Sequence, residues 1–148
     1  MLAKKHLPLL VLVTFAAGLV VGKLTKFESA AAASTQSQSK VFELRTYTTE
    51  EGKLDALHAR FREHTTKLFE KHGMTNIGYW QPEDAPLSGN TLIYVISHPS
   101  REAAKKNWAA FGADPEWQKV KRESEAQGKI VSKVDSVFLD ATDYSPLK

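Results

Sequence analysis

The sequence of 148 residues contains no cysteine. This absence excludes disulfide bonds, thiolate metal sites, cysteine nucleophiles and attachment of a lipid through cysteine. The chain also lacks a nucleophile elbow, a phosphate-binding loop and a dinucleotide fingerprint. A domain without disulfides must be held by its own apolar core, and the hydrophobic fraction of 42% is sufficient for one.

A net charge of one sign is also missing from most of the chain. The formal charge of +3 arises in the first 33 residues, which hold four of the 20 basic residues and one of the 17 acidic residues. The remainder therefore has 16 residues of each sign. Nucleic-acid binding needs several uncompensated cations, so we expect no nucleic-acid partner.

The first 33 residues resemble an export signal. Lys4 and Lys5 precede an apolar run at residues 7–21, and alanines at 30–33 offer small residues for cleavage. A helix of this run spans about 22 Å, which is short of a hydrocarbon core of ~30 Å. This favours a cleaved signal peptide and a periplasmic or extracellular location.

An uncleaved membrane anchor is the alternative. A long, charged segment that includes Lys23 and Lys26 separates the apolar run from the alanines. The protein is exported in either case, and the N-terminal segment would be its only contact with a membrane. Residues 34–40 are rich in Ser and Gln and are expected to form a flexible linker.

The remaining chain has the pattern of an α+β domain. Runs rich in β-branched and aromatic residues predict strands at 41–47, 75–80, 91–97 and 130–139. A capping-box pattern at Thr48 and Glu51 predicts the start of the first helix. Its apolar stripe consists of Leu54, Leu57, Phe61, Thr65, Leu68 and His72, and Gly73 marks its end.

Two further helices are expected before the last strand. Ser100 is placed to cap the first of them, and Asp114 with Pro115 to begin the second, which ends near residue 127. The order β-α-β-β-α-(α)-β is that of the ferredoxin-like fold, an antiparallel sheet with helices on one face. The other face must then be solvated or covered.

Residue parity in the first strand suggests how that face is covered. Glu43, Arg45 and Tyr47 share one face with Val41, a set too apolar for open solvent and too polar for a plain core. We therefore expect this face to be covered by a second copy of the chain, which predicts a homodimer with a cavity beside Arg45.

Several segments resemble the NIPSNAP family, in the family's order. They are FELRTY at 42–47, FREHT at 61–65, LFEKHGM at 68–74, GYW at 78–80, WAAF at 108–111, DPEW at 114–117 and DYSP at 143–146. The resemblance covers residues 41–146. It implies a dimeric α/β barrel, in which two ferredoxin-like sheets pack face to face.

Families with that barrel include cofactor-free monooxygenases, haem-handling enzymes and small-molecule isomerases. Most NIPSNAP members have no defined reaction. The animal members resemble mitochondrial proteins linked to vesicle or organelle roles. This chain departs from them in being one short domain behind an export-like leader.

The histidines give no metal site and no firm catalytic group. His58, His64 and His72 lie on or beside the expected buried face, but their spacing does not suit ligands on one helix. His64 and His72 are candidates for proton transfer, and the alternative is a structural role at the edge of the core. His98 could at most be a lone axial haem ligand. We expect neither a metal nor a cofactor.

Arg45 is the first candidate for ligand binding, because its planar guanidinium can hold an anionic or carbonyl group. The alternative is an ion pair with Glu43 that only fixes the interface. Glu43, on the same face as Arg45, is a further candidate for ligand binding. Tyr47, Tyr79 and Trp80 could supply flat apolar walls near the same sheet.

Three functions remain open from the sequence. The first is an exported homodimer that binds a small, largely apolar molecule. The second is a cofactor-free monooxygenase or isomerase, for which no catalytic motif is present. The third is a structural or interaction protein with a filled barrel.

Overall fold

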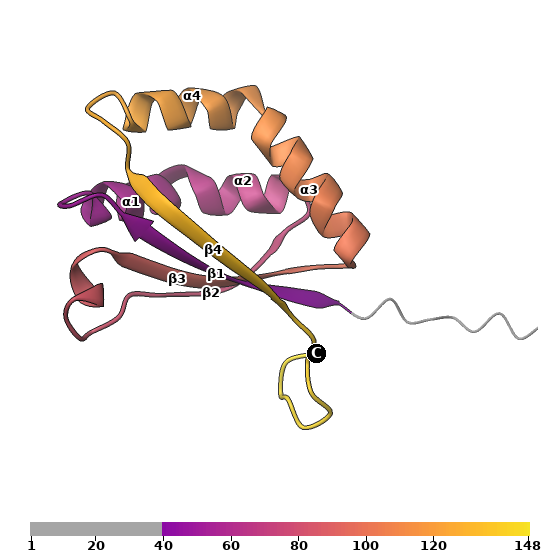
Figure 1. Ribbon diagram of the computed structural model, residues 1–148. Coiled ribbons are helices and arrows are strands. Elements are labelled where there is room, and N and C mark those ends of the chain that lie inside the picture. The colour runs from indigo at the N-terminus through magenta and orange to yellow at the C-terminus, as the bar shows by residue number, and fades with distance from the viewer. Residues whose placement is uncertain (1–39) are drawn as a thin grey trace, which may run out of the picture. The chain divides into compact units, whose positions relative to one another are not determined.

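Four antiparallel strands form one sheet in the order β2-β3-β1-β4 (Figure 1). The computed structural model describes residues 40–148. The expected leader at residues 1–33 and nearly all of the linker lie outside this range. The strands are β1 (Val41–Thr49), β2 (Thr75–Trp80), β3 (Thr91–His98) and β4 (Val131–Leu139).

The helices lie together on one face of the sheet (Figure 1). They are α1 (Leu54–Arg60), α2 (Thr66–Lys71), α3 (Arg101–Ala113) and α4 (Pro115–Ser124), with a short 3₁₀ turn η2 (Leu87–Gly89) before β3. Strand order and connections are those of the expected ferredoxin-like fold. Within residues 40–148, no helix is both long enough and apolar enough to cross a membrane.

Two of the three predicted helix starts are confirmed. The Ser100 hydroxyl accepts a hydrogen bond from the Ala103 N–H at 3.1 Å, and Asp114 accepts one from the Glu116 N–H at 2.7 Å. The capping box at Thr48 is wrong. Thr48 continues β1, where it pairs with both neighbouring strands, and the helix begins only at Leu54. Pairing with two strands outweighs a local capping pattern.

A π-helical turn, η1 (Phe61–Thr65), joins α1 to α2. The hydroxyls of Thr65 and Thr66 donate to the carbonyls of Arg60 and Phe61, five residues earlier. This widened turn alters the helical spacing after Phe61. As a result His64, expected beside the buried face, is 44% exposed.

Glu43, Arg45 and Tyr47 share one face of β1, as predicted. That face is the one covered by the helices, not the opposite face that was expected. Glu43, Arg45 and Tyr47 lie under the helices, as shown by contacts of Trp108 in α3 with both Glu43 and Arg45. The prediction that a second copy covers these residues is therefore wrong. A charged pair can lie under the helices because its groups find partners there.

The core fills the space between the helices and this face of the sheet. Tyr94 and Ile96 of β3 are fully buried there. The buried cluster consists of Leu54, Leu57, Phe61, Leu68, Phe69, Met74, Leu92, Tyr94, Ile96, Phe111 and Ile130.

The opposite face of the sheet carries an apolar surface. We call it the open face and define it by Leu44, Trp80, Ile93, Val95, Val137 and Leu139, which the strand register places on one side. The indole of Trp80 lies over Gly78, where a Cβ atom would come within 2.5 Å of it. Among these residues Trp80 is 53% exposed and Val137 54% exposed.

Candidate functional site

A cavity of about 340 Å³ lies between the helices and the β4 side of the sheet. Its aromatic lining is Tyr47, Phe61, Phe69, Phe111 and Trp117, and its aliphatic lining includes Val131 and Val134. Its polar lining is Arg60, Thr65, Lys121, Glu125, Lys129, Ser132 and Lys133. A volume of this size suits a small organic molecule.

Each wall of the cavity comes from a different element. The α1 end and η1 supply one side, and β1 and β4 supply the floor through Tyr47 and Val134, which are register partners. Phe111 of α3 and Trp117 of α4 pack with ring centroids 4.5 Å apart. The Asp114 cap between these helices fixes their turn, and so holds both rings at the cavity.

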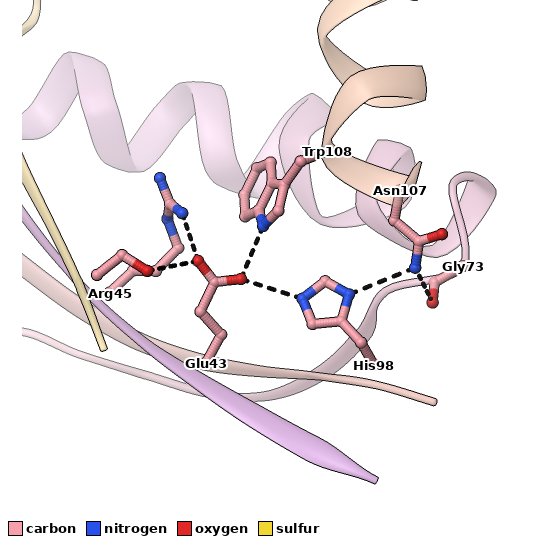
Figure 2. Close-up of polar contacts among 7 residues, drawn as sticks. Glu43, Arg45, Gly73, His98, Asn107 and Trp108 are labelled. Carbon is pink, nitrogen blue, oxygen red and sulfur yellow. Dashed lines mark hydrogen bonds and ion pairs between the residues drawn. The ribbon is translucent and has the colours of Figure 1, made fainter. Parts of the chain in front are cut away.

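Besides the cavity, the helix-covered face of the sheet carries a buried polar network around Glu43 (Figure 2). One carboxylate oxygen of Glu43 accepts hydrogen bonds from Arg45 Nη1 at 2.5 Å and Ser136 Oγ at 2.6 Å. The other accepts from Trp108 Nε1 at 2.7 Å and from His98 Nε2 at 3.1 Å. The carboxylate thus has four donors.

The network also fixes the hydrogen-bonding roles of the two ring nitrogens of His98. The Asn107 amide nitrogen donates to the Gly73 carbonyl at 2.9 Å and lies 3.3 Å from His98 Nδ1 (Figure 2). Nδ1 is therefore the acceptor, and Nε2 carries the proton that it donates to Glu43. With both ring nitrogens engaged, His98 has none left for haem iron.

The Glu43 carboxylate is held in its charged form. Burial alone would raise its pKa, but the hydrogen bonds from His98, Ser136, Trp108 and Arg45 outweigh burial and lower the pKa to about 2. A carboxylate with four hydrogen-bond donors and a pKa this low has little tendency to accept a proton, so it is a poor general base. The network therefore has the properties of a structural element.

Arg45 belongs to this network and is not among the residues that line the cavity. Its guanidinium carbon lies 4.2 Å from the Trp108 ring centroid and 5.5 Å from that of Tyr47, which stands at the cavity wall. Burial opposes the charge of Arg45, but Tyr47, Tyr94 and Glu43 together raise its pKa above the ordinary value. Its Nε is buried without a partner in the described part of the chain.

The other predicted ligand-binding residues are divided between the two faces. Tyr47 lines the cavity. Tyr79 stacks on Tyr94 at 5.3 Å and donates to Asn76 Oδ1, and burial raises its pKa. Trp80 lies on the open face, away from the other four.

The candidate histidines lie outside the cavity lining. His64 is exposed, and His72 Nε2 bonds Asp114 Oδ2 at 2.6 Å. His58 contacts the Gln81 side chain at 3.1 Å. Within residues 40–148, no three His, Cys, Asp or Glu side chains are grouped so that they could hold a metal ion.

The sequence comparison identifies the family. The family model described as NIPSNAP matches residues 42–146, which is most of the chain. The chain belongs to the NIPSNAP family. No curated protein sequence matches it.

Solved structures of NIPSNAP proteins share this fold. A NIPSNAP-like domain protein from Burkholderia xenovorans is 19% identical with a TM-score of 0.64, covering 74% of this chain and 90% of that one. A NIPSNAP family protein of unknown function from Agrobacterium tumefaciens is 19% identical with a TM-score of 0.64, covering 75% of this chain and 96% of that one. Another NIPSNAP family protein from that bacterium is 22% identical with a TM-score of 0.64, covering 74% of this chain and 99% of that one.

Most of the cavity residues of this NIPSNAP domain are not predicted from the sequence, and Arg60 is the buried charged residue among them. It follows Leu57 by three positions and directly precedes Phe61, so it lies beside the apolar stripe of the first helix. A cationic side chain beside an apolar stripe is the signal in the sequence that could have identified Arg60 as a site residue. Phe111 and Trp117, which belong to the family-like segments WAAF and DPEW, form another wall of the cavity.

Proposed function

We propose that this NIPSNAP protein is an exported homodimer that binds a small, largely apolar molecule in the cavity between its helices and its sheet. The observation that carries the proposal is the aromatic lining of a cavity of about 340 Å³. Apolar walls with a few polar groups are typical of small-molecule sites.

The cavity lining supports binding in preference to catalysis. It includes no histidine, and its one carboxylate, Glu125, is paired with Arg60 at 3.1 Å. General acid–base chemistry needs a titrating group within reach of the substrate. The candidates His64 and His72 do not line the cavity.

The homodimer is supported by the composition of the open face. Apolar side chains from all four strands lie there, together with the charged pair Lys133 and Asp135, 2.8 Å apart, in the first half and at the middle of β4. A second copy offers the same apolar surface, so two sheets could pack face to face and remove both from water. Export is supported by the apolar run at residues 7–21 and the alanines that follow it.

Binding is tested with 2-naphthamide, an uncharged aromatic probe, by isothermal calorimetry and tryptophan fluorescence. We expect the wild-type protein to bind it and Val134→Trp, which fills the cavity, to lose at least about 10-fold in affinity. Val137→Trp is the matched control. This valine is on the same strand with similar exposure but belongs to the open face.

The result against the proposal is absence of binding in the wild type, or equal loss in both variants. Equal loss would mean that the probe binds between subunits and not in the helix-side cavity.

Dimerisation is tested by sedimentation velocity with the same two positions. Val137→Asp would bury a carboxylate between sheets at a cost of several kcal/mol and should give monomers. Val134→Asp, on the other face, should stay dimeric. A monomeric wild type would refute the dimer and leave the cavity proposal standing.

A further inference from the structure

The polar groups around the cavity are mainly cationic. Arg60, Lys121 and Lys129 line it, against the single carboxylate of Glu125. Glu125 pairs with Arg60, and the ammonium of Lys133 pairs with Asp135 on the open face. Within residues 40–148, Lys121 and Lys129 have no ion-pair partner, so the cavity has an excess of positive charge.

Arg60 is the buried member of this group. Its side chain is 4% exposed, and its guanidinium carbon lies 5.4 Å from the Trp117 ring centroid. Nη1 donates to Glu125 Oε1 at 3.1 Å and contacts Ser124 Oγ at 3.4 Å. This places a fixed, oriented guanidinium against the aromatic cavity.

One edge of that guanidinium lacks a protein partner. Arg60 Nε is buried and has no hydrogen-bond acceptor among the described residues. A buried donor without an acceptor is unfavourable, and a ligand that supplies the acceptor removes this cost. A carboxylate can accept in the guanidinium plane from Nε and the adjacent Nη at once, and Nη1 is already used by Glu125. The Nε edge therefore matches an incoming carboxylate.

We infer that the ligand is an aromatic or similarly apolar carboxylic acid, whose carboxylate pairs with the Nε edge of Arg60. The aromatic walls hold its apolar body, and the lysines Lys121 and Lys129 attract the anion to the entrance. This inference rests on the proposed function, since it concerns the ligand of the same cavity.

The test compares 2-naphthoic acid with 2-naphthamide on the full chain at pH 7. The two probes have the same size, and only the acid is charged. Charge-assisted hydrogen bonds predict that wild-type protein binds the acid about 10-fold tighter or more. The double variant Arg60→Met with Glu125→Gln removes the guanidinium without leaving a buried charge unpaired. We expect it to bind both probes with affinities within about threefold of each other.

Arg62→Met is the matched control, because Arg62 is an exposed arginine two positions further along the chain. It should keep the preference for the acid. The double variant should bind 2-naphthamide with an affinity near that of the wild type. This result would show that its cavity is intact.

Each other outcome has one meaning. If the wild type binds acid and amide equally, the carboxylate inference is wrong and the cavity proposal stands. If neither probe binds, the cavity proposal itself fails. If the double variant keeps the preference and salt removes it, the lysines and not Arg60 select the anion, which overturns the assignment.

Discussion

Replacing Glu43 by glutamine tests the buried network. The amide keeps the shape of the side chain but removes the charge that balances Arg45. It also replaces one acceptor oxygen by an NH2 group, whose N–H donors face two existing donors. Glu43 is 1% exposed and Arg45 15% exposed in their side chains. Removing one partner of a buried ion pair typically costs about 3–5 kcal/mol, and we expect Glu43→Gln to lower the free energy of unfolding by that amount at pH 7.

The same substitution makes a prediction about pH. The pKa of Glu43 is about 2 in the folded protein against an ordinary value of 4.5. The carboxylate therefore contributes stability that is fully present above pH 4.5 and is lost as the pH falls from 4.5 toward 2. A pKa difference of this size corresponds to about 3 kcal/mol in total. At pH 3 the gap in stability between wild type and Glu43→Gln should be about 2 kcal/mol narrower than at pH 7.

The assay is urea unfolding followed by far-ultraviolet circular dichroism at one fixed protein concentration, because the proposed dimer would make stability depend on concentration. Glu63→Gln, at a side chain that is 64% exposed, is the control and should change stability by less than about 0.5 kcal/mol. The reasoning is refuted if Glu43→Gln is within about 1 kcal/mol of wild type at pH 7, or if the gap does not change with pH.

Three smaller predictions follow from other contacts. Arg45→Met should lower the unfolding free energy by a few kcal/mol, since it leaves the Glu43 carboxylate uncompensated, but leave 2-naphthamide affinity unchanged; a loss of affinity in calorimetry would show that Arg45 reaches the cavity. Gly78→Ala should push the Trp80 indole off the sheet, because the added Cβ would lie 2.5 Å from it; an unchanged near-ultraviolet circular dichroism spectrum would contradict this. Ser100→Ala should cost about 1 kcal/mol in urea unfolding through loss of a helix cap, and a neutral effect would mean that solvent replaces the cap.

Local signals in the sequence predicted local structure well. Thr75 to Trp80 was expected as a strand and is one, and the caps at Ser100 and Asp114 form as expected. The order of these elements was enough to give the ferredoxin-like fold. Each of these predictions depends on residues close together in the chain.

The site was harder to predict because it depends on contacts between distant elements. Parity showed that Glu43 and Arg45 share a face, but it cannot say which face the helices cover. The mixed character of that face predicts a surface covered by a second copy, whereas Trp108, His98 and Ser136 supply the buried partners from within the same chain. No local pattern marks donors that lie 55 to 93 positions away.

The π-helical turn explains the remaining misplacement. A regular helix would place His64 at the edge of the buried face, but the turn moves it into solvent while Phe61 and Thr65 stay buried. Arg60 directly precedes this turn, and its side chain lines the cavity. The threonines that stabilise the turn are common in ordinary helices, so their presence alone did not predict it.

Native mass spectrometry of the protein isolated from its own host tests the central claim most directly, because it reports the subunit number and any retained molecule together. We predict a dimer that carries a small organic molecule, and a Val134→Trp dimer from the same host that carries little or none. A wild-type protein without added mass, or a molecule retained equally by both proteins, would contradict the claim that the cavity between helices and sheet is the binding site.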